Sequence, residues 1–281
     1  MRSAMTVSDL LREGTRTLRE SVSESPGLDA EILLREALGA TREQLFDALP
    51  SPVRPAAAIS YRKLLKQRVD GIPIAYITGR REFYGHEFIV NSHVLVPRPE
   101  TEFLVEFALE WLKQKEEPCR VVDVGTGSGA IAISVALETA SQHIMLASDV
   151  SPEALDVAAR NAEALGAIVQ FVEGSLIDWL EEPVDLILAN LPYLRPDQAH
   201  DGIEHEPAVA LYAGDDGFSL NRSLLEDAPN KLRAGGAVIM ELDPEQRDLA
   251  LSAAQANLPD AGIEILADLA GNDRYLRIQT N

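Results

Sequence analysis

Residues 120–130 read RVVDVGTGSGA, and this stretch decides the fold. An apolar run leads into Asp123, and three glycines follow at every second position. Such a run is typical of a buried strand, and glycines let the backbone turn sharply and approach a ligand closely. The residues after the last glycine predict a helix over 129–140. A strand, a glycine loop and a helix in this order predict a nucleotide-type cofactor site at the carboxyl end of a parallel strand, with free backbone N–H groups facing the ligand.

Apolar strand-like runs alternate with helical stretches from residue 120 onward. This alternation predicts a doubly wound, mostly parallel α/β sheet of the Rossmann-like kind. The last two runs are too close in sequence for a helical crossover, so the seventh and final strand is expected to be antiparallel. The strand-like runs are 121–124, 144–148, 168–172, 186–189, 237–241, 263–267 and 275–278, with helices over 129–140 and 152–165 and another from Pro244.

The N-terminal segment, residues 1–74, is predicted to be a small helical bundle. Asp29 is a candidate cap for a helix that ends near Gly39, Thr41 and Gln44 form a capping-box pattern, and Pro55 can open a helix that runs to Gly71. Residues 75–97 are expected to form a β-hairpin connector, because aromatic and β-branched residues flank a central glycine. An amphipathic helix that ends near residue 115 then begins the catalytic domain, residues 98–281.

The glycine loop alone does not identify the cofactor. It also fits the dinucleotide fingerprint, so NAD is an alternative, and Asp149 at the end of the second strand could bind ribose hydroxyls of either cofactor. Asp123 lies where its charge could face the positive sulfonium and amino groups of S-adenosylmethionine, and no Tyr-x-x-x-Lys pair for hydride transfer follows. Together with the Asn190–Tyr193 segment described next, these features favour S-adenosylmethionine, which leaves S-adenosylhomocysteine as product. The candidate binding residues are Asp123, Gly125, Thr126, Gly127, Ser128, Gly129, Asp149, Ser175, Leu176 and Asn190.

Asn190-Leu191-Pro192-Tyr193 follows the fourth strand and is the candidate catalytic and substrate-binding segment. An amide nitrogen is a poor nucleophile because its lone pair is delocalised. A site that methylates it must place acceptors on both N–H bonds and aim the lone pair at the methyl group. The Asn190 side-chain oxygen and the Leu191 carbonyl can be those acceptors, Pro192 can stiffen the turn, and Tyr193 can stack on the planar amide. Such catalysis rests on positioning and needs no metal.

This segment resembles the (Asn/Asp)-Pro-Pro-(Tyr/Phe) motif of amino-group methyltransferases. Nearly the whole chain resembles the release factor glutamine methyltransferases, the PrmC/HemK family. The further matches are residues 80–84 (RREFY), residues 96–102 (VPRPETE), residues 123–129, Asp149 and residues 206–207 (EP). The resemblance implies N5-methylation of the glutamine in the Gly-Gly-Gln motif of peptide chain release factors, with the helical domain docking that substrate. Leu191 stands where the family has proline, which leaves the proposed carbonyl in place.

Arg98 and Glu100 in the VPRPETE segment have two readings. They could order the surroundings of the cofactor or substrate, or they could form a structural ion pair at the start of a helix. Other functions also stay open at this point. These are an amino-methyltransferase acting on a DNA or RNA base, a glutamine methyltransferase of a ribosomal protein, and a non-catalytic interaction module with the same fold.

Charge and composition narrow these alternatives. Residues 1–85 hold 13 Lys and Arg against 11 Asp and Glu, a net of +2, and residues 86–281 hold 12 against 34, a net of −22. Phosphate would be repelled by the second part, so no direct contact with nucleic acid is expected. The chain has no long apolar run and a single cysteine, Cys119. A cytoplasmic monomer without a membrane span, a signal peptide or a disulfide is expected.

A metal site is not expected. His200, His205 and Glu206 lie close together in sequence, but the segment reads as a solvated charged loop.

Overall fold

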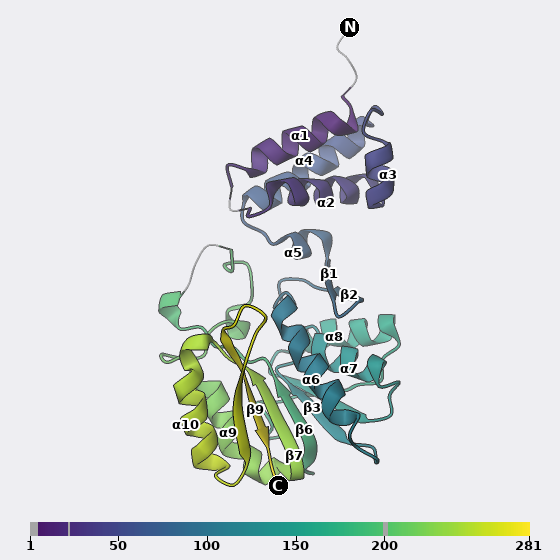
Figure 1. The fold of residues 1–281 in the computed structure, drawn as a ribbon. Helices are drawn as coiled ribbons and strands as arrows, with labels where there is room; N and C mark the ends of the chain where they lie inside the picture. Colours follow the sequence, from purple (N-terminus) through teal and green to yellow (C-terminus); the bar gives the residue numbers. More distant parts are fainter. Residues whose placement is uncertain (1–4, 22, 199–201) are drawn as a thin grey trace. The chain divides into compact units, whose positions relative to one another are not determined.

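The computed structural model describes residues 5–21, 23–198 and 202–281, which form two compact units (Figure 1). The first unit runs to Arg80 and includes a short piece of chain that ends at His205; the second begins at Arg81 and holds the rest. The division thus falls within the segment that the sequence assigns to a connector. The three-part division at residues 74 and 97 stays a prediction.

The first unit is helical, with a core of its own. Leu10, Leu33, Leu34 and Tyr61 are fully buried among leucines of neighbouring helices. The helices are α1 (Val7–Leu18), α2 (Pro26–Leu38), α3 (Arg42–Asp47), α4 (Pro55–Val69) and α5 (Ile74–Thr78).

The helix ends of this unit follow the sequence signals with one exception. Thr41 and Gln44 form the expected capping box, and Gly39 ends α2 with a left-handed φ of 62°. The prediction that Asp29 caps α2 is wrong, because α2 begins three residues earlier at Pro26. Asp29 lies inside the helix, and its carboxylate accepts from Arg68 Nε at 2.8 Å.

The expected hairpin is present but shorter than predicted. Strands β1 (Arg80–Phe83) and β2 (His86–Ile89) are joined by a two-residue turn at Tyr84 and Gly85, both with positive φ. Residues 75–78, predicted as part of the hairpin, belong to helix α5. Gly79 then takes a left-handed conformation and ends that helix.

The second unit contains the predicted Rossmann-like sheet. Its seven strands have the order β5-β4-β3-β6-β7-β9-β8, and all neighbouring pairs are parallel except the two that involve β9. The strands are β3 (Arg120–Val124), β4 (Ile144–Asp149), β5 (Gln170–Glu173), β6 (Val184–Ala189), β7 (Leu232–Glu241), β8 (Gly262–Ala267) and β9 (Asp273–Gln279).

Helices cover both faces of this sheet (Figure 1). On one face, α6 (Glu102–Leu112), preceded by the 3₁₀ turn η1 (Pro99–Thr101), and α7 (Ala130–Glu138) pack into one core, with α8 (Pro152–Leu165) beside them. On the other face, α9 (Ser219–Lys231) and α10 (Arg247–Asn257) pack into a second core. Short 3₁₀ turns complete the chain: η2 (Pro196–Gln198), η3 (Ala208–Ala210) and η4 (Pro244–Gln246).

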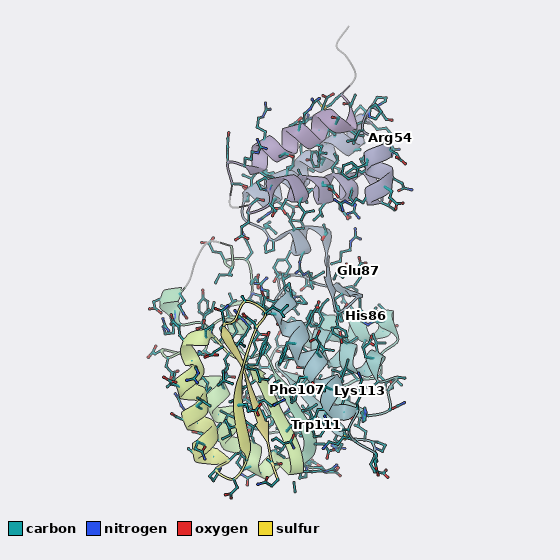
Figure 2. All side chains as sticks on the ribbon, in the orientation of Figure 1. Arg54, His86, Glu87, Phe107, Trp111 and Lys113 are labelled. Carbon is teal, nitrogen blue, oxygen red and sulfur yellow. The ribbon has the colours of Figure 1, made fainter. Side chains whose placement is uncertain are left out.

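Helix α6 shows how one face is held to the sheet. Phe107 and Trp111, one turn apart (Figure 2), are buried in the first core. Trp111 Nε1 donates to Gln279 Oε1 on β9 at 2.8 Å, and Lys115 Nζ lies 3.8 Å from the centre of its ring. The indole therefore combines burial with a satisfied donor. Among the described residues, no helix is long and apolar enough to cross a membrane.

Candidate active site

A pocket of about 260 Å³ opens at the carboxyl ends of β3, β4 and β6 within the second unit. Parallel strands of an open α/β sheet bring their following loops together at this edge, where ligands bind. Of the residues singled out from the sequence, the pocket is lined by Arg98, Gly125, Thr126, Gly127, Ser128, Asp149, Ser175, Leu176, Asn190, Leu191 and Pro192. Four others, Glu100, Asp123, Gly129 and Tyr193, lie outside the lining.

Most N–H groups of the glycine loop already donate hydrogen bonds within the protein. Gly125 and Thr126 both donate to the Ser148 carbonyl at 2.9 Å, and Gly127 donates to Asp149 Oδ2 at 2.9 Å. The expectation of free N–H groups facing the ligand is therefore wrong at these positions, because the end of β4 supplies acceptors for them. Ser128 is the residue of this loop whose N–H makes no hydrogen bond within the described chain.

Asp123 lies beneath the loop and has no exposed surface. Its Oδ2 accepts from the Thr126 hydroxyl at 2.6 Å and from the Ala132 N–H in the first turn of α7 at 3.2 Å, while Oδ1 is buried without a partner in the described chain. Burial raises the pKa of this carboxyl to about 6. A direct contact between Asp123 and the cofactor stays a prediction.

Together these contacts disfavour a dinucleotide. A pyrophosphate is bound by free N–H groups of the loop and by the positive end of the following helix. Here the carboxylates of Asp149 and Asp123 already occupy the loop and the start of α7. The pocket walls are instead apolar, with side chains that include Val124, Val150 and Leu176. Such a lining fits an adenosine group without phosphates.

Asp149 ends β4 with both carboxylate oxygens engaged. Oδ2 accepts from Gly127, and Oδ1 accepts from the Ser151 N–H at 2.9 Å. Burial raises the pKa of the carboxyl from its ordinary value. A carboxylate oxygen can accept a second hydrogen bond, so Asp149 keeps capacity for ribose hydroxyls. Leu176, after β5, holds a left-handed φ of 46°, and its carbonyl accepts from Ser148 Oγ and Trp179 Nε1.

Asn190 and Leu191 present two acceptors at the pocket. Asn190 Nδ2 donates to the Thr101 hydroxyl at 2.9 Å, and neither Asn190 Oδ1 nor the Leu191 carbonyl accepts a hydrogen bond from the described chain. The Leu191 side chain is 4% exposed and packs beside Gly125, where an added Cβ would lie 2.9 Å from Leu191 Cδ2. The leucine side chain thus fills space next to the glycine loop.

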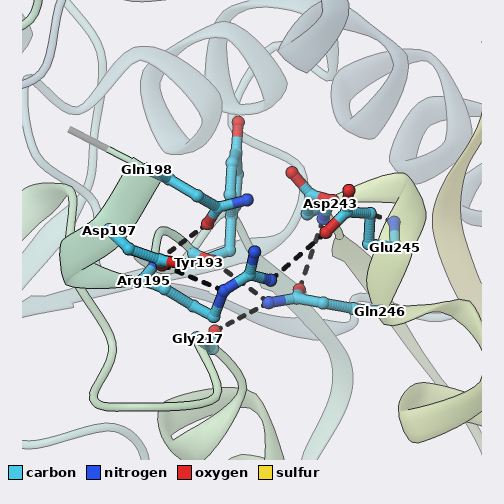
Figure 3. Close-up of polar contacts among 8 residues, drawn as sticks. All are labelled: Tyr193, Arg195, Asp197, Gln198, Gly217, Asp243, Glu245 and Gln246. Carbon is cyan, nitrogen blue, oxygen red and sulfur yellow. Dashed lines mark hydrogen bonds and ion pairs between the residues drawn. The ribbon is translucent and has the colours of Figure 1, made fainter. Parts of the chain in front are cut away.

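Tyr193 is held by its main chain. Its carbonyl accepts from Gln246 Nε2 at 3.1 Å, and the same nitrogen donates to the Gly217 carbonyl at 2.8 Å (Figure 3). Arg195, two residues on, pairs with Asp197 and Glu245. Burial raises the pKa of the Tyr193 hydroxyl to about 12, with the nearby Glu241 carboxylate adding to the shift. Stacking of the Tyr193 ring on the substrate stays a prediction.

Arg98 and Glu100 do not form an ion pair with each other. Arg98 Nη2 instead donates to Glu206 Oε1 at 2.6 Å, and the Glu100 main-chain carbonyl accepts from the Tyr275 hydroxyl at 2.8 Å. The reading of an ion pair between them at the helix start is therefore wrong. Arg98 also lines the pocket, and its partner Glu206 belongs to the Glu206-Pro207 pair, one of the sequence matches that carry the family resemblance.

The histidine-containing loop lacks a metal cluster in the part that can be described. His200 lies outside the described residues, and the His205 ring nitrogen Nε2 lies 3.0 Å from the Asp70 carbonyl oxygen.

The structure adds four polar residues that sequence reasoning missed as parts of the site: Thr101, Asn161, Glu241 and Gln246. Each is almost fully buried. Asn161 accepts from the Ile89 N–H at 2.7 Å and donates to the carbonyls of Ile89 and Ser128 at 3.0 and 2.9 Å, so it links strand β2 to the glycine loop. A buried polar residue with partners in distant segments leaves little local signal. Glu241 is an exception, because its charged side chain directly follows the apolar run over residues 237–240.

Comparisons with known proteins agree with this geometry. The family model of the PrmC N-terminal domain matches residues 9–79, and that of the methyltransferase small domain matches residues 101–209. A methyltransferase from Pyrococcus furiosus has a similar fold, with a TM-score of 0.51 and 18% identity over 71% of this chain and 91% of that one. The fold and site define a Rossmann-like methyltransferase that depends on S-adenosylmethionine.

Curated relatives define the family more closely. Release factor glutamine methyltransferases from Deinococcus radiodurans and Neisseria gonorrhoeae are 38% and 41% identical to this chain. The first match covers 97% of this chain and 98% of the relative, and the second covers 90% and 93%. The chain belongs to the release factor glutamine methyltransferase family.

Proposed function

We propose that this enzyme transfers a methyl group to the side-chain amide nitrogen, N5, of the glutamine in the Gly-Gly-Gln motif of peptide chain release factors. The observation that carries the proposal is the pair of free acceptors at the pocket, Asn190 Oδ1 and the Leu191 carbonyl. A primary amide has two N–H bonds, and two fixed acceptors match them. The names of the relatives support a release factor as substrate. A cytoplasmic monomer is part of the same proposal.

The cofactor side of the pocket is assigned by chemistry. Asp149 would accept hydrogen bonds from ribose hydroxyls, and the segment from Gly174 to Leu176 would flank the adenine. The buried, unpartnered Asp123 Oδ1 leaves negative charge beneath the loop. Bound S-adenosylmethionine supplies an electrophilic methyl group on a positively charged sulfur.

The catalytic side works by orientation. Hydrogen bonds from the substrate N–H groups to Asn190 Oδ1 and to the Leu191 carbonyl would hold the amide plane and favour a pyramidal nitrogen. The nitrogen lone pair would then point at the methyl group, and the new N–C bond would form as the C–S bond breaks. The methylated nitrogen would then lose one proton to solvent water, which leaves the neutral N5-methylamide and S-adenosylhomocysteine. Fixing two reactants in this way supplies much of the rate enhancement without a strong base.

The test combines purified enzyme, labelled S-adenosylmethionine and unmethylated release factor, with total RNA, total DNA and ribosomal proteins in parallel. Peptide mapping locates the label. Label on the Gly-Gly-Gln glutamine, lost when that glutamine is replaced by alanine, is the expected result. Label confined to nucleic acid would identify a base methyltransferase. Label on a glutamine of a ribosomal protein would identify a ribosomal-protein methyltransferase. Either result would overturn the proposal.

A further inference from the structure

Three side chains from separate segments form a hydrogen-bond chain that leads away from the pocket. Asn190 Nδ2 donates to Thr101 Oγ1 at 2.9 Å, and the Thr101 hydroxyl donates to Glu241 Oε2 at 2.8 Å. Asn190 follows β6, Thr101 ends η1 and Glu241 ends β7. Thr101 and Glu241 are 5% and 1% exposed. Water therefore has little access with which to replace either bond.

The hydrogen-bond chain has a direction, because the Thr101 hydroxyl donates to the Glu241 carboxyl at its far end. The ionised form of the Glu241 carboxyl has no proton to donate, so with that form the single hydroxyl proton of Thr101 is directed to Glu241. The Thr101 oxygen is then left with lone pairs, and it must receive a hydrogen bond from Asn190. The nitrogen of the Asn190 amide is a donor and its oxygen is not. Nδ2 is thereby turned toward Thr101, and Oδ1 is turned the other way.

We infer that Thr101 and Glu241 are positioning residues for methyl transfer, setting the orientation of the Asn190 amide so that an acceptor and not a donor meets the substrate. This inference rests on the proposed function, because it is the substrate amide that needs an acceptor. A flipped Asn190 would present an NH₂ group to an N–H of the substrate. The two donors would repel each other, and the clamp would lose one of its two hydrogen bonds.

Groups from several elements around Glu241 set its ionisation. The charged or titratable groups around it are Arg274 on β9, Arg98 and Glu100 on the segment that contains η1, and the hydroxyls of Tyr193 and Tyr275. Burial has the largest effect and, together with Glu100, raises the pKa of the Glu241 carboxyl to about 7 against the opposing effects of the Thr101 hydroxyl and the two arginines. The carboxylate form, which fixes the direction of the hydrogen-bond chain, therefore predominates above about pH 7. Neither Thr101 nor Glu241 needs to touch the substrate to have this effect.

The experiment compares Thr101→Val with Thr101→Ser in the full-length enzyme. Valine keeps the shape and removes the hydroxyl, while serine keeps the hydroxyl. Thr139→Val is the matched control, because the Thr139 hydroxyl bonds only to carbonyls of its own helix. The readouts are kcat and KM for the unmethylated release factor, the dissociation constant for S-adenosylmethionine, and the side-chain amide NMR signals of Asn190, assigned by their loss in Asn190→Asp.

Thr101→Val is expected to lower kcat by about tenfold or more, the equivalent of about one hydrogen bond, with little change in KM or cofactor affinity. Its Asn190 amide signals should shift. Thr101→Ser should restore both properties, and Thr139→Val should change neither.

Two results would overturn the inference. One is a Thr101→Val enzyme with wild-type kcat and unshifted Asn190 signals. The other is a parallel fall of kcat, cofactor affinity and thermal stability that serine does not rescue, which describes a purely structural contact. A failure of the proposed function looks different, because the wild-type enzyme would then leave the Gly-Gly-Gln glutamine unlabelled. In that case the NMR signals alone decide whether Thr101 orients Asn190.

Discussion

The Nε2 atom of Gln246 lies 3.1 Å from the carbonyl oxygen of Tyr193 and joins the catalytic segment to the loop at Gly217. Gln246 is 4% exposed, and the described part of the chain offers no other donor to either carbonyl. The space is also filled, because a Cβ added at Gly217 would lie 2.4 Å from the Tyr193 oxygen. The catalytic segment is therefore anchored through the main-chain carbonyl of Tyr193, which leaves the two acceptors at Asn190 and Leu191 free for substrate.

Replacing Gln246 by Leu should loosen that support. A buried carbonyl at Gly217 and a half-buried one at Tyr193 would lose their donor, and an unsatisfied buried group costs about 1–3 kcal/mol of unfolding free energy. We expect lower stability in urea unfolding and a lower kcat at unchanged cofactor affinity. Gln255→Leu is the control, because Gln255 is exposed and donates to the Pro259 carbonyl outside the site. Equal effects of the two substitutions would contradict the proposed role of Gln246.

Asn190→Ala should abolish most turnover and preserve cofactor binding. Loss of one preorganised hydrogen-bonding group at a reacting centre costs about 10²–10³ in kcat. Calorimetric titration with S-adenosylmethionine and single-turnover rates separate the two effects. Asn257→Ala, which removes an amide bonded to its own helix, is the control. An Asn190→Ala enzyme that keeps its turnover would rule out the amide clamp.

Leu191→Pro tests whether position 191 acts through its carbonyl alone. The Leu191 N–H makes no hydrogen bond within the described chain, so proline removes no donor that is in use. We expect turnover close to wild type. The unfolding free energy should fall by about 1–3 kcal/mol, because part of a buried leucine side chain beside Gly125 is lost. A folded variant that binds the cofactor but has no activity would show that the leucine itself is required.

Gly127→Ala and Gly166→Ala separate backbone strain from intrusion into the pocket. Both glycines have positive φ, 55° and 73°, and an added Cβ meets no atom within 4 Å at either position. The two substitutions should therefore cost similar backbone strain, about 1–2 kcal/mol. Gly127 lines the pocket, so only its substitution should weaken S-adenosylmethionine binding, by about tenfold or more. Equal affinities would mean that the cofactor does not pass close to Gly127.

Glu241→Gln should change how stability depends on pH. Burial raises the pKa of the Glu241 carboxyl from 4.5 to about 7, so between these values the folded state holds a proton that the unfolded state has lost. Wild-type stability therefore falls as pH rises from about 4.5 to 7 through this group, and it changes no further above pH 7. The glutamine variant does not lose this stability, so its unfolding free energy relative to that of the wild type should rise by about 3 kcal/mol between pH 4.5 and 7. Urea unfolding at pH 5 and pH 8 measures the difference. Parallel pH curves would contradict a buried, titrating Glu241.

The sheet could be predicted because its central strands, buried on both faces, are continuous apolar runs. Leu186–Ala189 is such a run, Val121–Val124 is apolar except for the buried Asp123, and the glycine loop marks the point where strand passes to helix. The edge strand β5 begins two residues later and ends one residue later than predicted, because the exposed Ile168 extends the apolar pattern. Helix α9 was missed because it has no side-chain cap and contains Pro229.

The site could be predicted where chemistry and sequence position coincide. Asn190, Asp149 and the glycines follow strand ends that the fold brings to one edge of the sheet. Thr101 and Glu241 could not be found in this way, because their meeting depends on pairing between segments 140 residues apart. The partner of Arg98 was missed for the same reason, since Glu206 lies 108 residues further along the chain.

The hydrogen bonds of Asn161 affect how the second unit unfolds locally. Two strands of four residues are marginal when isolated, yet the Ile89 N–H of β2 is bonded to a side chain of α8 and not to a neighbouring strand. Hydrogen exchange at Ile89 is thus governed by α8, and the Ser128 carbonyl shares the same anchor. The hairpin end, the helix and the rim of the cofactor loop should therefore unfold as one cooperative unit. Cofactor binding should slow amide exchange in all three together, including a hairpin that lies in a different part of the sequence.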